Sequence, residues 1–254
     1  MHRPMHRPLL AAILAPVLLA ACGGGGGGGG GGQDNGPGSA PAGASYQFRT
    51  PKAGAHLVYS ASLADNLNNT LNRSVTDDVT AVNADGSFTV HEEDPSHNAI
   101  VSGVTDQTLY PTDFQYNAAG QATAWTVAGR AGSVQCTVSG ASGAPGALAI
   151  GGSWSTSFTE TCGSGPGAVF TQSGTLAGIE SVTVPAGTFT AYKFVSTTTR
   201  TLNGVTRVES TTRWRDQAGG DSRTITEASV FTYSGATPPA GALLQQVREL
   251  QSYR

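Results

Sequence analysis

The sequence predicts an all-β protein built from one antiparallel meander of rather long strands. Its 254 residues include 30 threonines and 35 glycines, a composition that favours strands and turns over helices. Turn signals recur along the chain with no convincing helical pattern between them. Several segments alternate apolar and polar residues with a period of two, which is typical of strands with one buried face.

The first 21 residues are predicted to be a secretory signal peptide. Basic residues open the chain, and the apolar run over residues 9–21 is too short to span a bilayer as a stable helix. Residues 19–22, Leu-Ala-Ala-Cys, resemble a bacterial lipobox, where the cysteine is acylated and the chain is cleaved before it. We therefore expect Cys22 to carry acyl chains such as palmitate and to anchor a lipoprotein to a membrane.

Residues 22–44 are predicted to form a disordered tether between this anchor and the folded domain. Ten consecutive glycines occupy positions 23–32, and Gly-rich chains behave as random coils. Residue 23 is Gly rather than the Asp associated with inner-membrane retention. We expect the protein on the periplasmic side of the outer membrane, with exposure at the cell surface left open. The formal charge of −3 gives no general attraction to nucleic acid.

One β domain is expected over residues 45–254, and its turns can be located. Asn83 and Asn117 each lie three residues before a Gly, a pattern in which Asn bonds nearby backbone and Gly takes a left-handed conformation. The pair Asn203-Gly204 is a two-residue hairpin signal. Further corners are expected at residues 184–188 and 216–220.

The strands between these turns follow one another along the chain. Residues 205–215 alternate most clearly, because Arg207 and Arg213 share one parity while Thr, Val and Trp occupy the other. The charged face of this strand is expected to be wet and the Thr-rich face buried. Residues 242–253 suit a helix or a closing strand, and we favour the strand. Shorter alternating or strand-like runs cover residues 71–81, 88–90, 114–116, 125–127, 133–138 and 153–162.

Two cysteines remain once Cys22 is lipidated, and they predict a disulfide. Cys136 and Cys162 lie on two strand-like runs in an exported protein, where an even pair is usually oxidised. A metal-binding or redox-active thiol pair is the alternative, but the chain has neither the CxxC spacing nor an adjacent His.

Sequence motifs for catalysis are absent. The chain has no nucleophile elbow, zinc-protease motif, phosphate-binding loop or dinucleotide-binding motif. Residues 91–94, His-Glu-Glu-Asp, with His97 nearby, offer imidazole and carboxylate groups that transition metals favour. A charged strand end that leads into a loop explains the same residues and is preferred. We predict no catalytic residue, no metal and no cofactor, and a hydrolase is the least favoured class.

Charge is distributed unevenly along the predicted domain. Residues 65–113 contain nine acids and one base, Arg73, whereas residues 193–223 contain six bases and three acids. A basic surface for anionic lipid headgroups or glycans is one interpretation. Cross-strand pairs within one sheet, or charges that face water, are the preferred interpretation.

The C-terminal third carries a resemblance to a group of exported proteins. Residues 180–189, Glu-Ser-Val-Thr-Val-Pro-Ala-Gly-Thr-Phe, resemble a pattern in poorly characterised proteobacterial β-rich periplasmic proteins and lipoproteins of unknown function. The pattern continues with Tyr192, Lys193, Trp214, Gly219 and Gly220. Some of these proteins are similar to the half-barrel of lipoprotein carriers, so the resemblance implies a half-barrel or open barrel and no established activity. The carriers lack a lipid anchor of their own, and this chain has long Gly/Ser/Ala loops at residues 140–152 and 163–168.

These observations favour a non-enzymatic outer-membrane lipoprotein whose concave sheet binds an apolar or amphipathic ligand such as a lipid. The alternative is a structural or interaction lipoprotein that contacts a protein partner in a cell-envelope assembly. Six aromatic residues are candidates to line a ligand site or to fill the core: Phe114, Tyr116, Trp125, Trp154, Phe194 and Trp214.

Overall fold

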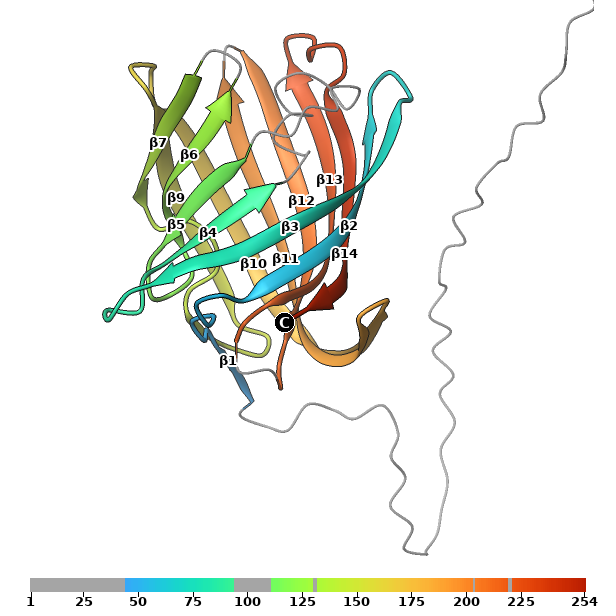
Figure 1. Ribbon diagram of the computed structural model, residues 1–254. Helices are drawn as coiled ribbons and strands as arrows, with labels where there is room; N and C mark the ends of the chain where they lie inside the picture. Colours follow the sequence, from blue (N-terminus) through green and yellow to red (C-terminus); the bar gives the residue numbers. More distant parts are fainter. Residues whose placement is uncertain (1–43, 94–110, 130–131, 203, 219–220) are drawn as a thin grey trace, which may run out of the picture. The chain divides into compact units, whose positions relative to one another are not determined.

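Antiparallel strands close into a barrel in the described part of the computed structural model (Figure 1). The structure describes residues 44–93, 111–129, 132–202, 204–218 and 221–254. The chain divides into two units, Met1–Gly38 and Ser39–Arg254, and described residues occur only in the second. The predicted signal peptide, Cys22 and almost all of the predicted tether therefore lie outside the described residues.

Twelve described strands make up the barrel wall, and each pairs with its neighbours in chain order. The last strand, β14, pairs with β2 and closes the cylinder, with Leu250 opposite Tyr59. The all-β antiparallel prediction is confirmed, and the sheet closes completely where a half-barrel or open barrel was expected. The ambiguous segment 242–253 is a strand. The wall consists of β2(His56–Asp65), β3(Thr70–Val82), β4(Phe88–Glu93), β5(Thr112–Tyr116), β6(Ala122–Gly129), β7(Gly132–Gly140), β9(Ser153–Cys162), β10(Ala168–Val184), β11(Gly187–Leu202), β12(Val205–Asp216), β13(Thr224–Gly235) and β14(Leu243–Tyr253).

The two Asn-x-x-Gly turns form where the sequence predicts them. The backbone N–H of Gly86 donates to the carbonyl of Asn83 at 3.0 Å, and that of Gly120 donates to the carbonyl of Asn117 at 2.9 Å. Both glycines have positive φ angles, +82° and +74°, which a residue with a Cβ adopts only at a cost. Local turn chemistry therefore fixes the β3–β4 and β5–β6 hairpins.

A small second sheet lies at the end of the barrel where the chain ends (Figure 1). It pairs β1(Ser45–Gln47) with β8(Ala147–Ala149). Tyr46 of β1 is buried, and its ring packs edge-on against Tyr192 at 5.4 Å and Phe194 at 4.8 Å between ring centroids. The hydroxyl of Tyr192 donates to the carbonyl of Ser45 at 2.9 Å, which ties β1 to the barrel wall.

The apolar core lies inside the barrel, mainly along β2. Leu57, Tyr59 and Leu63 point inward from alternate positions of β2 and pack with Leu250 of the neighbouring β14. Full burial of one such side chain stabilises the fold by about 1.5–3 kcal/mol. Among the described residues, no helix has the length and apolar character needed to cross a membrane.

Candidate functional site

The charged face of β12 points into the barrel. Arg207, Glu209 and Arg213 share one parity, and all three border the internal cavity. The expectation that this face is the wet outer surface and that the Thr-rich face is buried is therefore wrong. The alternation was identified correctly, but ion pairs inside the barrel let charged side chains face inward, and the Thr-rich parity forms the outer wall.

The cavity inside the barrel has a volume of about 430 Å³, within the range typical of small-molecule sites. Its wall combines arginines and carboxylates with aromatic rings. The charged lining residues are Asp77, Glu92, Glu160, Arg207, Glu209, Arg213, Arg215, Glu227 and Arg248. The aromatic lining residues are Tyr46, Tyr59, Tyr116, Trp125, Trp154, Phe158, Phe170 and Phe194.

Arg248 holds two carboxylates together across the lumen. Its Nη2 lies 3.0 Å from Asp77 Oδ1, and its Nη1 lies 3.2 Å from Glu92 Oε2. The guanidinium carbon lies 4.5 Å from the centre of the Tyr59 ring, close enough for a cation–π contact. The phenol of Tyr59 donates to the carbonyl of Thr224 at 3.1 Å, and burial, followed by the charge of Asp77, raises the pKa of Tyr59.

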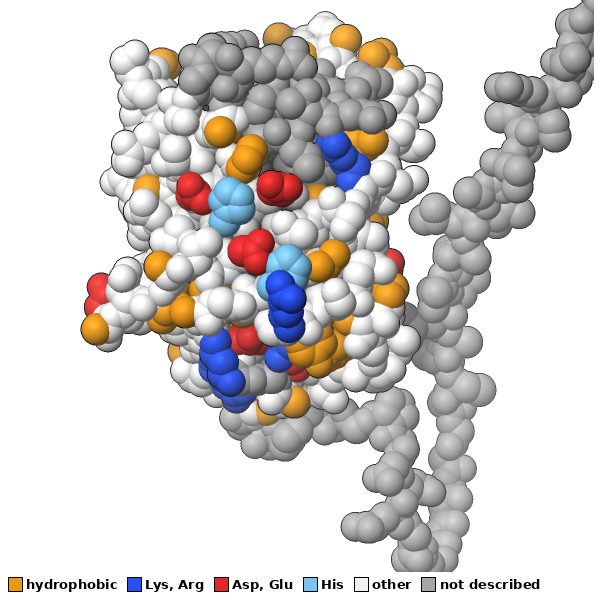
Figure 2. Space-filling view, viewed as in Figure 1, with side chains coloured by type: hydrophobic (Ala, Val, Ile, Leu, Met, Phe, Trp, Pro, Cys, Tyr) orange, Lys and Arg blue, Asp and Glu red, His pale blue; other side chains and the backbone are white. Residues whose placement is uncertain are grey.

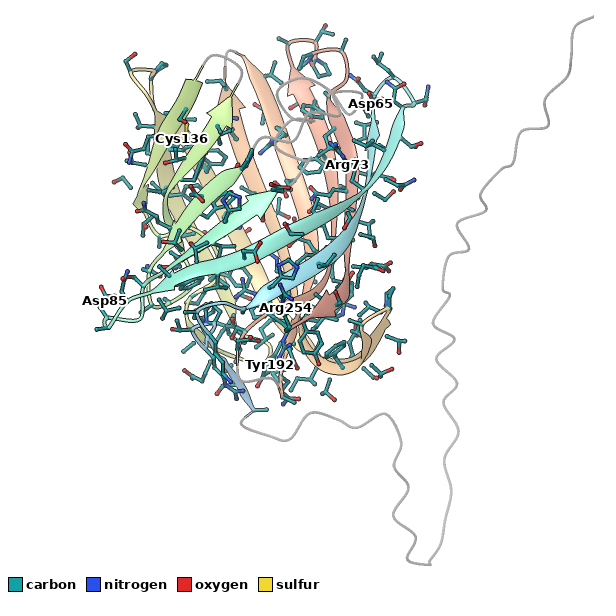
Figure 3. The ribbon with its side chains drawn as sticks, viewed as in Figure 1. Asp65, Arg73, Asp85, Cys136, Tyr192 and Arg254 are labelled. Carbon is teal, nitrogen blue, oxygen red and sulfur yellow. A yellow bond between two sulfur atoms is a disulfide. The ribbon has the colours of Figure 1, made fainter. Side chains whose placement is uncertain are left out.

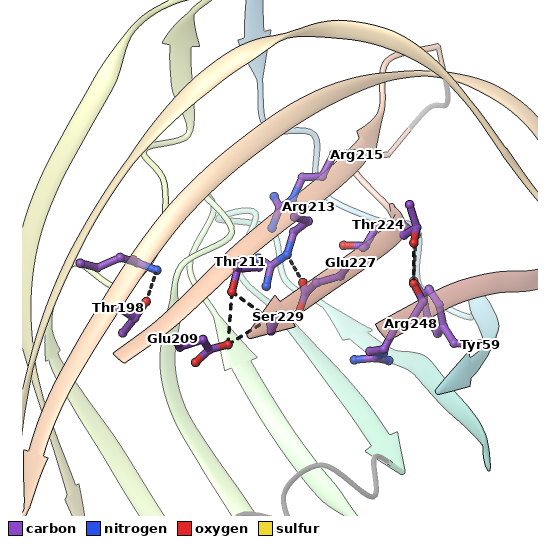
Figure 4. A network of polar contacts seen from close by, with 12 residues as sticks. Tyr59, Thr198, Glu209, Thr211, Arg213, Arg215, Thr224, Glu227, Ser229 and Arg248 are labelled. Atoms are coloured by element: carbon purple, nitrogen blue, oxygen red, sulfur yellow. Dashed lines mark hydrogen bonds and ion pairs between the residues drawn. The ribbon is translucent and has the colours of Figure 1, made fainter. Parts of the chain in front are cut away.

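A second polar network joins β12 to β13 (Figure 4). Arg213 and Glu227 form an ion pair, and the carboxylate of Glu227 is the main cause that raises the pKa of Arg213. Glu209 accepts hydrogen bonds from the hydroxyls of Thr211 at 3.3 Å and Ser229 at 3.2 Å. Burial nevertheless raises the pKa of Glu209, because desolvation outweighs the nearby cations.

Aromatic side chains cover the inner side of β9, β10 and β11. The rings of Phe158 and Phe170 stack with their centroids 4.8 Å apart, and Arg200 lies over the other side of Phe170, with its guanidinium carbon 5.2 Å from the ring centre. The indole of Trp154 lies close to Gly174, where a Cβ would come within 2.3 Å of the ring. Gly174 therefore makes room for Trp154 in the wall.

The same three strands carry polar groups with unfilled bonding capacity. The indole Nε1 of Trp154 and the Nε of Arg200 are buried and have no hydrogen-bond partner among the described residues. Burial raises the pKa of the Glu160 carboxyl and lowers that of the Arg200 guanidinium, since each charged form loses solvation. We call the inner side of β9, β10 and β11, with Trp154, Glu160, Phe170 and Arg200, the aromatic wall.

The structure brings together four of the six aromatic candidates. Tyr116, Trp125, Trp154 and Phe194 border the cavity. Phe114 is not among the lining residues, but its ring contacts Trp125 and Tyr116, with centroids 5.9 and 6.1 Å away.

Trp214 lies apart from these residues, on the opposite parity of β12 from the lining arginines. Its indole donates to Glu180, and the ammonium of Lys193 lies 5.3 Å from the ring centre. Trp214 is therefore an outer-wall residue and provides a natural control for the tryptophans of the lumen.

Cys136 and Cys162 form a disulfide, as the sequence predicted. They oppose each other directly in the β7–β9 register, and Cys136 lies on the inner side of the barrel, away from the end that holds Tyr192 (Figure 3). Glu160 lies close to both sulfurs, but a disulfide offers no thiolate ligand, so this group is not a metal site. The bridge links β7 to β9, which is one strand of the aromatic wall.

The cluster that begins at His91 is split by strand alternation. Glu92 points into the lumen toward Arg248, whereas the imidazole of His91 contacts Asp113, with 2.7 Å between Nδ1 and Oδ1. Asp94 and His97 lie outside the described residues. His91 and Glu92, which were grouped from sequence as candidate metal ligands, therefore lie on opposite faces of β4 and do not form one site.

Several lumen residues escaped the sequence reasoning. Asp77, Glu227 and Arg248 face the cavity from β3, β13 and β14, and each pairs with a charge of opposite sign. Residues directly opposite each other in an antiparallel pair share one face of the sheet. Leu57 opposes Asp77 and Glu227 opposes Arg248, so the register would have assigned these charged residues to the inner face. Using that signal requires the strand register, which a single sequence does not supply.

No known family model matches this chain, and no curated protein matches it significantly. Among solved structures, the chain is similar to a candidate exported protein with a YmcC-like fold from Bacteroides fragilis, with 10% identity and a TM-score of 0.42 over 83% of this chain and 100% of that chain. A candidate lipoprotein from Parabacteroides distasonis shows 11% identity and a TM-score of 0.41 over 83% and 99%. The hypothetical lipoprotein YmcC from Escherichia coli shows 10% identity and a TM-score of 0.36 over 82% and 89%. Likenesses at this level assign no function to this chain.

Proposed function

We propose that this protein is a non-enzymatic, lipid-anchored envelope protein whose barrel lumen binds a small amphipathic ligand. The observation that carries the proposal is a cavity of about 430 Å³ lined by aromatic rings on one side and by arginines and carboxylates on the other. Aromatic rings provide apolar contact area, and a few fixed polar groups orient a ligand.

The aromatic wall is the part of the lumen best suited to hold this ligand. The indole of Trp154 borders the cavity and its N–H has no partner among the described residues, so a ligand oxygen can satisfy this donor. The stacked rings of Phe158 and Phe170 offer a flat apolar surface beside them. A purely apolar ligand is disfavoured, because it would desolvate the Glu160 carboxyl at the cavity wall without offering it a hydrogen bond.

Attachment at Cys22 would place the barrel next to a membrane. Two or more acyl chains hold a protein stably on a bilayer, and the Gly-rich segment that follows provides reach. We infer the periplasmic side of the outer membrane from Gly at position 23. Replacing Cys22 with Ser should abolish labelling by radioactive palmitate and move the protein from the membrane fraction to the soluble fraction. An unchanged distribution would refute the anchor.

The ligand proposal is tested on the mature chain in two steps. Protein purified without denaturation is extracted and analysed by mass spectrometry for a co-purified amphiphile. Binding of 1-anilinonaphthalene-8-sulfonate, an aromatic anion, is then measured by fluorescence. We expect Trp154→Leu to weaken binding at least about tenfold, equivalent to about 1.4 kcal/mol, because it removes lumen surface.

The matched control is Trp214→Leu, which removes the same side chain from the outer wall and should leave probe binding unchanged. A protein that carries no extractable ligand and binds no probe would refute the proposal. Equal effects of the two tryptophan variants would also refute it, because they would place the probe outside the lumen.

A further inference from the structure

A row of alternating imidazole and carboxylate groups crosses four adjacent strands on the outside of the barrel. His56 of β2 opposes Asp78 of β3, Asp78 opposes His91 of β4, and His91 opposes Asp113 of β5. Their inward neighbours along the strands are residues such as Leu57 and Glu92, so the four side chains share the outer face. Figure 2 shows two histidines among acidic side chains on this face.

Each imidazole in this row already contacts a carboxylate. His56 Nδ1 lies 2.5 Å from Asp78 Oδ1, and His91 Nδ1 lies 2.7 Å from Asp113 Oδ1. In the first of these pairs, a divalent cation that replaces the shared proton is bound by His56 Nδ1 and Asp78 Oδ1 at once. Both imidazoles are partly exposed, so an ion can reach them from solvent.

We propose that this row binds a divalent transition metal such as Zn²⁺, with Asp78 at the centre and the imidazoles of His56 and His91 on either side. Imidazole nitrogen and carboxylate oxygen are ordinary Zn²⁺ ligands, and three protein ligands plus water complete a four-coordinate site. Directly opposed residues on neighbouring strands have Cβ atoms about 4.5–5.5 Å apart, so Asp78 is within reach of both histidines.

Occupancy of this site requires two side-chain movements. The ion takes the place of the proton between His56 Nδ1 and Asp78 Oδ1, so these atoms must move apart from 2.5 Å to form bonds of about 2.0 Å each to the ion. His91 leans toward Asp113, so it must turn toward Asp78 to share the ion, and exposed side chains change rotamer in picoseconds to nanoseconds. Arg254 lies next to His56 through a pair of backbone hydrogen bonds, and its positive charge disfavours an ion on the β14 side. Charge therefore favours the Asp78 side of His56, where the row carries its carboxylates.

The assigned ligands give different expectations for the four residues. Titration calorimetry of the mature chain with Zn²⁺ at neutral pH should show one site of micromolar affinity. His56→Ala, Asp78→Asn and His91→Ala should each weaken Zn²⁺ binding at least about tenfold. Asp113→Asn should change it less than about threefold, because Asp113 only orients His91 in the metal-free protein. Co²⁺ in place of Zn²⁺ should give the visible absorption bands of a four-coordinate nitrogen and oxygen site.

The controls keep the proposal falsifiable. His97→Ala, which removes the other histidine of the mature chain, should leave Zn²⁺ binding unchanged. Circular dichroism should show that each variant keeps its strand content, because all four residues of the row lie on the outer face. Absence of a site of at least micromolar affinity, a loss of affinity on His97→Ala, or an effect of Asp113→Asn as large as that of Asp78→Asn would overturn the proposal.

Discussion

Replacing Arg248 with Met should destabilise the barrel more than any other single change in the charged lumen. The substitution keeps an unbranched side chain of similar length but removes the cation that Asp77 and Glu92 share at 3.0 and 3.2 Å. The three side chains are only 14, 18 and 12% exposed, so solvent screens the two carboxylates poorly once the cation is lost.

The magnitude follows from the geometry. At an effective dielectric constant of about 20, a pair separated by about 3 Å contributes roughly 5 kcal/mol of Coulomb energy. The variant no longer carries the free-energy cost of desolvating the guanidinium. This saving offsets part of the Coulomb energy lost with the two pairs. Breaking a buried ion pair typically costs about 3–5 kcal/mol, and we expect Arg248→Met to fall in that range. For a domain of about 200 residues this lowers the melting temperature by roughly 6–20 °C.

Urea and thermal unfolding followed by circular dichroism measure this effect. Glu249→Gln, on the outer face of the same strand, is the matched control and should change stability by less than about 0.5 kcal/mol. Adding Asp77→Asn and Glu92→Gln to Arg248→Met should recover most of the stability, because no uncompensated charge remains. A stability loss below about 1 kcal/mol for Arg248→Met would show that the network contributes little and would refute the reasoning.

Three further changes test other parts of the fold. Replacing Cys136 and Cys162 with Ala should cost about 3–4 kcal/mol in urea unfolding, since their bridge closes a loop of 26 residues, and an equal stability of the reduced and oxidised proteins would contradict this. Glu160→Gln should stabilise the protein by up to about 1 kcal/mol at pH 7 but not near pH 4. The raised pKa of Glu160 means that the native state binds the proton more tightly than the unfolded chain, so wild-type stability falls as pH rises from about 4.5 through the native pKa. Asp65→Ala should cost about 2–3 kcal/mol above pH 5, because the carboxylate accepts three hydrogen bonds from Leu67 and Asn69 in the β2–β3 turn. These bonds outweigh burial and lower the pKa of Asp65, so this cost should shrink as pH falls below about 4, and a cost independent of pH would contradict the assignment.

Local chemistry explains which parts of the fold were predictable from sequence. The turns that end at Gly86 and Gly120 depend on local bonds, and the structure places them as expected. In the Gly120 turn the side chain of Asn117 accepts the N–H of Ala119, and in the Gly86 turn the side chain of Asp85 accepts the N–H of Ser87. The Cys136–Cys162 bridge followed from counting cysteines in a chain predicted to be exported. Strand alternation was likewise visible, because it needs only a period of two.

Closure of the barrel was not predictable in the same way. It depends on pairing between Tyr59 and Leu250, which lie far apart in the sequence, and nothing local in either strand specifies the other. Closure also decides which face is inside. A period of two assigns residues to two faces but does not distinguish an outer surface from a lumen lined by charged residues. The rule that charged faces point outward therefore assigned the charged face of β12 to the wrong side.

The charged pairs of the lumen separate a structural part from the part proposed to bind a ligand. Arg213 opposes Glu227, and Glu227 opposes Arg248, so charges of opposite sign alternate across β12, β13 and β14. Charges that neutralise one another in this way hold strands together and have little capacity left for a ligand. In the aromatic wall, Trp154 of β9 and Arg200 of β11 have buried N–H groups without partners among the described residues. Because a buried donor without a partner costs about 1–3 kcal/mol, a ligand that supplies an acceptor to the Trp154 indole recovers part of this cost. The ligand is therefore expected to bind at β9, β10 and β11 and to leave the Arg248 network intact.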